Sequence, residues 1–327
     1  MLQDIGSPFP CTWGFTSMLA LFLALSLVAD AAVPVTESVE LKTPTGTLHG
    51  VLDLPAGKGP WTVVFIHPGS GPTDRDGNSA LTKNDSLKLL GEGLATKGFA
   101  CLRIDKRGIA KSAAAMTKEE DLRITTYADD AALWAKWLRA DARFGKVVFL
   151  GHSEGSLIGS LATEAKWDAF VSLCGPGRKL GDVLREQLKK NLPKELYGTC
   201  ETLLTELEAG REVKETPPAL AALFRPSVQP YLISMLKSDP AKSLAAWKCP
   251  VLVISGTTDI QVAEADSKVL ATARPDMVNV RIENMNHVLK EIDTTAVLVQ
   301  SVSYQSPKLP LHPQLIGTIT GFLKKLK

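Results

Sequence analysis

Apolar runs of strand length alternate with segments of helical periodicity along most of the 327-residue chain. Such alternation places helices on both faces of a parallel sheet, and it therefore predicts an α/β fold with a mostly parallel central sheet flanked by helices. The strand candidates are Trp61–His67, Phe99–Asp105, Lys146–Gly151, Ala169–Gly175, Pro250–Gly256 and Val278–Asn284. The helix candidates are Ser86–Lys97, Tyr127–Ala140, Ser156–Ala165, Ala263–Ala273 and Gln314–Lys327.

Two segments depart from this alternation. Val35–Leu54 contains two alternating stretches around a turn sequence, which predicts an antiparallel hairpin leading into the fold. Residues 178–247 contain helical patterns and proline breaks but no strand pattern, which indicates an insertion after the sixth core strand. Ligands of open α/β sheets bind at the carboxyl ends of the strands, so we expect this insertion to form a helical cap over that edge. The alternative is a solvent-facing helical ornament.

Composition narrows the functional classes. An apolar content of 45% supplies a sizeable core for one domain over residues 32–327. The formal net charge is only +2, and the densest basic stretch, Lys189–Lys194, is short. Nucleic-acid binding is therefore not expected. The expected partner is instead a small-molecule substrate. The sequence does not indicate an oligomeric state.

The first 31 residues resemble an export signal. Met18–Val28 is an apolar run, and the small residues Ala29 and Ala31 suit cleavage after Ala31. The run is shorter than the roughly 20 residues needed to span a bilayer, so we expect no stable membrane insertion after cleavage. No Lys or Arg precedes Lys42, so the basic start typical of such signals is missing. The expected location is the periplasm of a Gram-negative cell.

Cysteine spacing provides no metal signature. Export would place Cys101, Cys174, Cys200 and Cys249 in an oxidising compartment, where a bridge from Cys200 is possible without being required. No Cys/His pair has the spacing of zinc ligands, and neither a metal nor an organic cofactor is expected.

The pattern Gly-x-Ser-x-Gly occurs at residues 151–155, directly after an apolar strand and before a helix. A turn from strand to helix within so few residues strains the corner residue, and flanking glycines let the neighbouring backbone pass close to it. The corner side chain then points out above the sheet at the positive end of the helix. Ser153 is therefore the candidate nucleophile.

A serine nucleophile needs a base, and the base needs a carboxylate that orients it. His287 follows the last core strand, and Asp259 follows the strand before it, so both belong to loops at the same sheet edge as Ser153. The chain order Ser, Asp, His is the order expected for a nucleophile on such an elbow. Asp105 and Glu154 are rival acids, although ion pairing near the adjacent basic residues is the expected role of Asp105.

An attacked carbonyl becomes an oxyanion, which needs two fixed hydrogen-bond donors. The backbone N–H of Glu154, directly after the nucleophile, is one candidate. The loop after Ile66 should supply the other, with Ser70 as the first candidate and Gly69 as the second. The nearby sequence at residues 74–78 is interpreted as a turn held by local ion pairs, because most ligands of a calcium loop, including the bidentate Glu, are missing.

Together these motifs resemble the α/β-hydrolases of the small bacterial carboxylesterase type, a branch related to serine aminopeptidase-like hydrolases. The resemblance covers nearly all of residues 35–327. It rests on "HPGSGPTDRDGN", "RIDKRGIAKS", "GHSEGS", "LFRPSVQPYL", "GTTDIQV" and "NMNHVLK", in that order.

The resemblance implies hydrolysis of carboxylic esters, with short acyl groups favoured, through an acyl-enzyme and without a cofactor. It assigns Ser153 as nucleophile, Asp259 as acid and His287 as base, with Ser70 and Glu154 as oxyanion donors. It also implies that Leu223–Leu232, inside the expected cap, overhangs the acyl pocket.

Two further activities use the same chemistry. An aminopeptidase-like or a thioester hydrolase would employ the same three residues, and a peptidase of this kind would need acids in the cap for a free amine. Glu201, Glu206 and Glu208 are acids of the expected cap that could take this role. A non-catalytic binding protein on this scaffold is disfavoured, because none of the three candidate residues is replaced.

Overall fold

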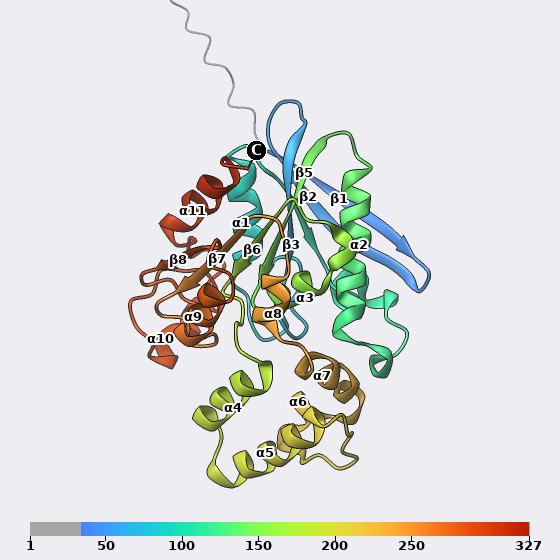
Figure 1. Ribbon diagram of the computed structural model, residues 1–327, viewed down its shortest axis with the longest axis vertical. Coiled ribbons are helices and arrows are strands. Elements are labelled where there is room, and N and C mark those ends of the chain that lie inside the picture. Colours follow the sequence, from blue (N-terminus) through green and yellow to red (C-terminus); the bar gives the residue numbers. More distant parts are fainter. Residues whose placement is uncertain (1–33, 327) are drawn as a thin grey trace, which may run out of the picture. The chain divides into compact units, whose positions relative to one another are not determined.

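The computed structural model describes residues 34–326, so the expected export signal lies outside the described residues. Within this range eight strands form one sheet in the order β1-β2-β4-β3-β5-β6-β7-β8 (Figure 1). The pairings of β2 with β1 and with β4 are antiparallel, and the remaining pairings are parallel, which confirms the mostly parallel sheet. The strands are β1 (Val35–Thr43), β2 (Gly46–Leu54), β3 (Trp61–His67), β4 (Ala100–Ile104), β5 (Phe144–His152), β6 (Ala169–Leu173), β7 (Val251–Gly256) and β8 (Val278–Ile282).

Helices cover both faces of the sheet. One face carries α1 (Ser86–Ala95) and α11 (Pro313–Leu323). The other face carries α2 (Ile124–Arg139), α3 (Glu154–Leu161), α8 (Pro240–Ala245) and α9 (Glu264–Ala273). Side chains of β3 alternate between the two cores, since Val63 and Phe65 join one cluster while Val64 and Ile66 join the other. This burial on both faces explains why the central strands are continuous apolar runs.

The predicted helices are present, with shifted boundaries. α3 begins at Glu154, two residues before the predicted start, and a short 3-10 helix at Thr163–Ala165 replaces its predicted last turn. The earlier start follows from the sharpness of the corner, because a single residue, Ser153, separates the end of β5 from the first residue of the helix.

The insertion between β6 and β7 is helical. Figure 1 shows α4 to α7 beyond the carboxyl ends of the strands. Its last helix, α8, instead packs against α3 and α9 and so belongs to the layer that covers the sheet. The other helices are α4 (Leu180–Asn191), α5 (Lys194–Glu208), α6 (Ala221–Phe224) and α7 (Gln229–Leu236), with 3-10 turns at Pro218–Leu220 and Pro226–Val228. The role of this segment as a substrate cap stays a prediction.

One helix, α10 (Val297–Ser303), was not predicted. It exposes Val297, Leu298 and Val302 and buries Gln300 and Ser303 completely. A search for helices by an apolar buried face fails on such a segment, because the polar residues occupy that face.

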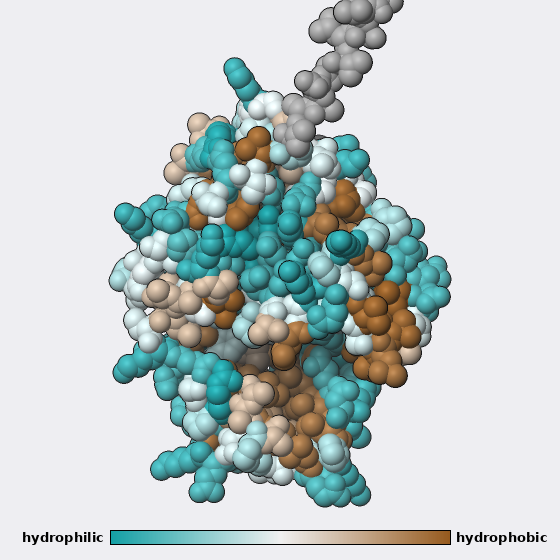
Figure 2. Space-filling model, turned by 180° about the vertical axis from the view of Figure 1, so that it is seen from behind, coloured by the Kyte–Doolittle hydropathy of each residue, from teal (hydrophilic) through white to brown (hydrophobic). Residues whose placement is uncertain are grey.

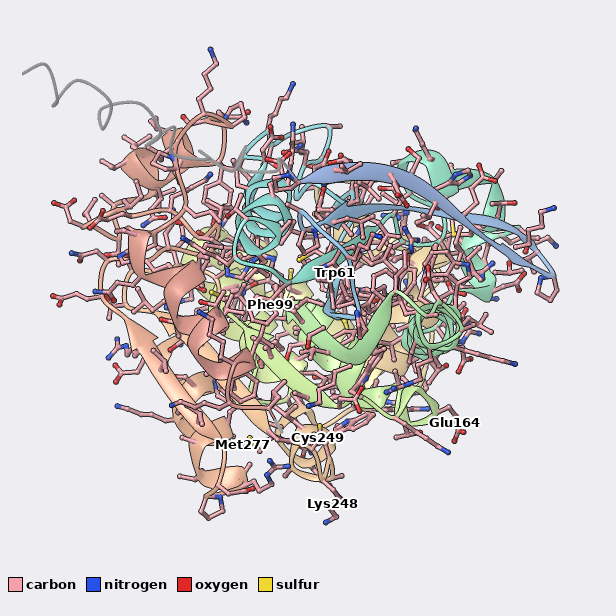
Figure 3. The ribbon with its side chains drawn as sticks, turned by 90° about the horizontal axis from the view of Figure 1, so that it is seen from above. Trp61, Phe99, Glu164, Lys248, Cys249 and Met277 are labelled. Carbon is pink, nitrogen blue, oxygen red and sulfur yellow. The ribbon has the colours of Figure 1, made fainter. Side chains whose placement is uncertain are left out.

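Figure 3 looks onto the amino ends of the strands, where Trp61, Phe99, Cys249 and Met277 stand at or just before β3, β4, β7 and β8. A groove of about 360 Å³ opens at this edge. It is lined by Thr163, Lys166, Trp167, Ser243, Ala246, Trp247, Lys248 and Cys249. The elbow with the candidate nucleophile lies at the opposite, carboxyl edge, so this groove is not where a substrate would meet it.

The four cysteines of the described range are free thiols, and three of them, Cys101, Cys174 and Cys200, are buried. The bridge considered for Cys200 is therefore not formed. No helix within residues 34–326 combines the length and the apolar content that a membrane span needs.

Candidate active site

Ser153 occupies the strained corner that the sequence predicts. β5 ends at His152, α3 begins at Glu154, and Ser153 between them has φ 55° and ψ −127°. A positive φ is unfavourable for a residue with a Cβ, and such strain persists only where the surrounding structure enforces it. The backbone N–H of Ser153 donates to the carbonyl oxygen of Leu173 in β6, which helps to hold the corner.

The two flanking glycines are required by close backbone contacts. A Cβ on Gly151 would lie 2.4 Å from the carbonyl carbon of Gly155. A Cβ on Gly155 would lie 2.5 Å from the carbonyl oxygen of His67, at the end of β3. Both distances are far below van der Waals contact, so Gly151 is required by the close approach of the first turn of α3, and Gly155 is required by the packing of the elbow against β3.

His287 and Asp259 form the pair that the sequence predicts. Nδ1 of His287 lies 2.8 Å from Oδ2 of Asp259, and both side chains are almost completely buried. The loop after β7 carries Asp259, and the loop after β8 carries His287. Because Asp259 accepts this bond, the proton sits on Nδ1, and Nε2 of the imidazole is left free to accept a proton.

The environment of Asp259 keeps it ionised. Burial alone would raise the pKa of this carboxyl group, but the neighbouring His287 and two backbone donors hold it below its usual range. The donors are the N–H groups of Gln261, 2.8 Å away, and Val262, 2.9 Å away, both to Oδ1. Asp259 is therefore a fixed carboxylate acceptor for the imidazole.

His152 ties the elbow to the loop of the candidate base. Its Nε2–H donates to the carbonyl oxygen of His287 over 2.8 Å, and the two rings lie 4.9 Å apart. Burial lowers the pKa of His152 to about 3, and the adjacent His287 acts in the same direction, so this imidazole is neutral at physiological pH. No role for His152 is predicted from the sequence. Its only signal was its place inside the elbow, next to Ser153.

The loop after β3 approaches the nucleophile at Gly69. A Cβ on Gly69 would lie 3.0 Å from the Cβ of Ser153. Ser70 is exposed, and its carbonyl oxygen accepts a bond from Thr73. The loop therefore brings the two predicted oxyanion candidates beside the serine, with Gly69 in the closer contact. Glu154 is the first residue of α3, so its N–H has no partner within the helix.

Lys106 anchors the same loop through hydrogen bonds to its backbone. Its buried Nζ donates to the carbonyl oxygens of Gly69 and of Gly71, the latter over 2.9 Å. The ammonium also lies 5.5 Å from the ring centre of Tyr127. Burial lowers the pKa of Lys106 to about 8, and the nearby Glu154 carboxyl group opposes that shift. A lysine beside an aspartate favours an ion-pair interpretation, so this contact is not predicted from the sequence.

Asp105, a rival acid in the sequence analysis, belongs to an ion pair. Its carboxylate pairs with the guanidinium of Arg75 and accepts the Arg75 backbone N–H over 3.0 Å. The predicted role of ion pairing is confirmed, but the partner comes from the distant loop rather than from Lys106 or Arg107. Arg107 pairs instead with Asp130 on α2.

The turn at residues 74–78 is held, but not by the local ion pairs that were predicted. Its ion pairs reach β4 and the residue after it, and its local bonds are hydrogen bonds to backbone N–H groups. Asp76 pairs with Arg103 of β4, which also pairs with Asp53. Asp74 accepts the backbone N–H groups of Asp76 and Asn78. The carboxylates are thus engaged by arginines and by backbone donors.

Glu154, the second rival acid, is buried beneath α7. Burial raises its pKa, while Lys106 and the hydroxyl of Tyr231 oppose the shift. Tyr231 of α7 also packs edge-on against Tyr127, with ring centres 5.8 Å apart. The predicted segment Leu223–Leu232 thus reaches the start of α3. In Figure 2, apolar side chains gather around a hollow between the sheet body and the inserted helices.

Three acids of the insertion were considered for binding a free amine, and each of them is paired. Glu201 and Glu208 both bind Arg185, each over 2.7 Å. Glu206 binds Arg211, also over 2.7 Å. None of these carboxylates is held free for the ammonium group of a peptide substrate.

One group of side chains has the residue types of a metal site. One ligand atom each from His152, Cys174 and His287 lie within 4.8 Å of one another. Both histidines already use a ring nitrogen, for the carbonyl of His287 and for Asp259 respectively. Burial, first, and the adjacent Asp259 raise the pKa of the Cys174 thiol, which keeps it protonated. The two histidines of this group are therefore used for hydrogen bonds around the candidate base.

A mostly parallel sheet with a strained serine elbow after β5, and with an Asp–His pair on the loops after β7 and β8, defines the α/β-hydrolase class. The chain belongs to this family, since the family model described as alpha/beta hydrolase fold matches residues 62–291.

Several known proteins are similar to this chain. Esterase EstD of Thermotoga maritima is 31% identical over 258 residues, which cover 77% of this chain and 61% of that protein. The chain thus spans about 61% of the length of this relative.

Solved structures share the fold at low sequence identity. Est1E of Butyrivibrio proteoclasticus, solved with bound ferulic acid, has a TM-score of 0.58 at 16% identity, covering 81% of this chain and 96% of that chain. The α/β hydrolase GrgF of Penicillium sp. sh18 also has a TM-score of 0.58, at 15% identity, covering 89% of this chain and 99% of that chain.

Proposed function

We propose that this protein is a serine hydrolase that cleaves carboxylic esters with short acyl groups. The observation that carries the proposal is the 2.8 Å contact between Nδ1 of His287 and Oδ2 of Asp259, beside the strained elbow of Ser153. Nucleophilic acyl transfer requires a positioned base next to a serine hydroxyl that a substrate can reach.

The proposed reaction has two halves. The Oγ atom of Ser153 attacks the ester carbonyl while Nε2 of His287 takes the hydroxyl proton, and Asp259 stabilises the resulting imidazolium. His287 then protonates the departing alcohol, which leaves an acyl group on Ser153. A water molecule, deprotonated by the same imidazole, attacks this acyl-enzyme, and His287 returns the proton to Oγ of Ser153 as the carboxylic acid leaves.

The tetrahedral oxygen of each step needs donors. The N–H of Glu154 is the first, because it stands unpaired within its helix at the positive end of α3. The N–H of Ser70 is the proposed second donor, with Gly69 as the alternative. The closeness of Gly69 to Ser153 and the anchoring of the loop by Lys106 support this assignment.

Ester substrates are favoured over peptides with a free amino end. The candidate acids for such an amine, Glu201, Glu206 and Glu208, are neutralised by Arg185 and Arg211. The similarity to an enzyme named as an esterase points the same way. A thioester hydrolase would use the same residues and is the second candidate, whereas a binding protein would not need the aligned Asp–His pair.

A substrate panel tests the proposal. Short-chain nitrophenyl esters, acyl thioesters and aminoacyl nitroanilides are compared with the wild-type protein and with Ser153→Ala. We expect the esters to give the highest kcat/KM, and Ser153→Ala to abolish that activity. Equal or faster cleavage of the aminoacyl nitroanilides would contradict the substrate class.

The three candidate residues should act as a unit. Ser153→Ala and His287→Ala should each remove most of the ester hydrolysis, and the double substitution should cost little more. Asp259→Asn should also be severe, on the order of 10⁴-fold in kcat when a triad aspartate is neutralised. Strict additivity of the two alanine losses would argue against a shared step.

We also propose export, with cleavage after Ala31 and a mature chain that acts in the periplasm. The apolar run Met18–Val28 and the small residues that follow it support this location. N-terminal sequencing of the protein recovered from the periplasmic fraction should give Ala32 first. Recovery of a soluble form that retains residues before Met18 would overturn the proposal.

A further inference from the structure

Helix α10 buries polar residues and exposes apolar ones, which is the reverse of an ordinary surface helix. Its polar residues Gln300 and Ser303 are fully buried, whereas Leu298 is 85% exposed and Val297 and Val302 are each 64% exposed. The apolar patch at the right edge of Figure 2 lies where this helix stands in the turned view. Burial of polar groups is unfavourable unless they are hydrogen-bonded, so the polar side chains on the inner face of α10 must have specific hydrogen-bond partners.

The partners are the two loops that carry the candidate acid and base. The side-chain amide of Asn286, the residue before His287, donates to Oε1 of Gln300 over 3.0 Å and to Oγ of Ser303 over 2.8 Å. The amide of Gln300 donates to the carbonyl oxygen of Thr258, the residue before Asp259, over 3.1 Å. Gln300 therefore binds both loops at once, each one residue away from the His–Asp pair.

Each polar atom of the Asn286 side chain, and its backbone N–H, has a hydrogen-bond partner. Oδ1 of Asn286 accepts a hydrogen bond from the backbone N–H of Lys290 over 2.9 Å. The backbone N–H of Asn286 donates in turn to the carbonyl oxygen of Lys290. The loop that carries His287 is thus folded back on itself and then fastened to α10. The second proton of the Gln300 amide donates to the carbonyl of Thr294, just before the helix, over 2.6 Å.

We propose that Gln300, together with Asn286 and Ser303, positions His287 against Asp259. This inference rests on the proposed function and adds a part that the local motifs do not contain. The three side chains touch no reacting atom and act only through the two loops. A fully satisfied buried network gives such loops one geometry, and a misplacement of about 1 Å at a catalytic group can cost about 100-fold in rate.

A double-mutant cycle between Gln300 and Asp259 tests the proposal. Gln300→Met keeps the size of the side chain and removes its hydrogen bonds. We expect kcat for a short nitrophenyl ester to fall by about 10- to 100-fold with KM nearly unchanged. In an Asp259→Asn background the same substitution should lower kcat less than about two-fold, because the pair that it positions is already broken.

Two controls separate positioning from loss of stability. Gln229→Met removes a second fully buried glutamine, which bonds to backbone carbonyls of Val213 and Phe224 in the insertion. Its effect on kcat, whatever the size, should be the same in both backgrounds. Leu298→Gln alters the outer face of α10 without touching the network and should leave kcat unchanged.

The outcomes separate this inference from the proposed function. If Gln300→Met lowers kcat by the same factor in both backgrounds, or not at all, the positioning role is overturned while the triad stands. If Asp259→Asn and Ser153→Ala leave ester hydrolysis intact, the proposed function itself fails. Should Gln300→Met lose its native circular dichroism, Ser303→Ala takes its place in the same cycle, with the same pattern expected at smaller size.

Discussion

Nε2 of His152 lies 2.8 Å from the backbone carbonyl oxygen of His287, so the neighbour of the candidate nucleophile holds the loop of the candidate base. His152→Phe keeps a ring but removes this donor, and it should lower kcat for ester hydrolysis by about 10-fold or more. His152→Gln retains an N–H and should lose less. Steady-state kinetics on both variants check the order, and an equally active phenylalanine variant would contradict this role of the contact.

The contact between Gly69 and Ser153 makes the loop after β3 sensitive to a single methyl group. Gly69→Ala places a Cβ 3.0 Å from the Cβ of Ser153, so the loop must move away from the serine. We expect kcat to fall, with an upper limit of about 10²- to 10³-fold if an oxyanion donor is lost. Ser70→Ala, which alters only an exposed side chain, is the matched control and should stay near wild type. Kinetics that rank the two variants in the reverse order would rule out a backbone donor here.

Lys106 should matter for activity although it touches no substrate atom. Lys106→Met leaves the carbonyls of Gly69 and Gly71 without their donor, which costs about 1–3 kcal/mol at the buried Gly69 and less at the exposed Gly71. The loop should loosen, and kcat/KM should fall by about 10-fold or more. Lys111→Met, at an exposed lysine nearby, is the control. Urea unfolding and ester kinetics together measure both effects, and an unchanged kcat/KM in Lys106→Met would show that the loop does not need this anchor.

Acid should destabilise the protein through its buried neutral histidines. Burial, with a contribution from Lys106, lowers the pKa of His67 to about 3, far below the usual 6.5. Between these two values the unfolded chain binds a proton that the folded chain does not, so the free energy of unfolding falls as pH decreases from 6.5. Each such histidine contributes a slope of about 1.4 kcal/mol per pH unit.

His67→Gln should remove one such contribution. The slope of unfolding free energy against pH, measured by urea unfolding between about pH 4 and pH 6, should then be about 1.4 kcal/mol per pH unit shallower than in the wild type. Parallel curves for the wild type and His67→Gln would show that His67 binds its proton equally well in both states.

The parts of the fold that the sequence predicted are those with a periodic signal. Strands buried on both faces are continuous apolar runs, and the elbow glycines at 151 and 155 stand in a short Gly-x-Ser-x-Gly pattern directly after such a run. Asp259 and His287 were found because parallel strands end at a common edge. Each of these inferences needs only local pattern and topology.

What the sequence did not predict depends on contacts between distant segments. Lys106 meets the loop at Gly69 across the sheet edge, and a lysine beside Asp105 carries no local sign of that contact. Helix α10 was missed because its buried face holds Gln300 and Ser303, the reverse of the expected pattern. The pairing of the insertion's acids with Arg185 and Arg211 likewise follows from helix packing that one sequence does not reveal.

Covalent labelling of the nucleophile tests the central claim most directly. The wild-type protein is treated with a fluorophosphonate probe, digested, and mapped by peptide mass spectrometry beside Ser153→Ala and His287→Ala. The account predicts one adduct, on Ser153, formed much more slowly in His287→Ala and absent from Ser153→Ala. Loss of ester hydrolysis should follow the labelled fraction one for one. An adduct on another residue with Ser153 unmodified, or ester hydrolysis that survives in Ser153→Ala, would contradict it.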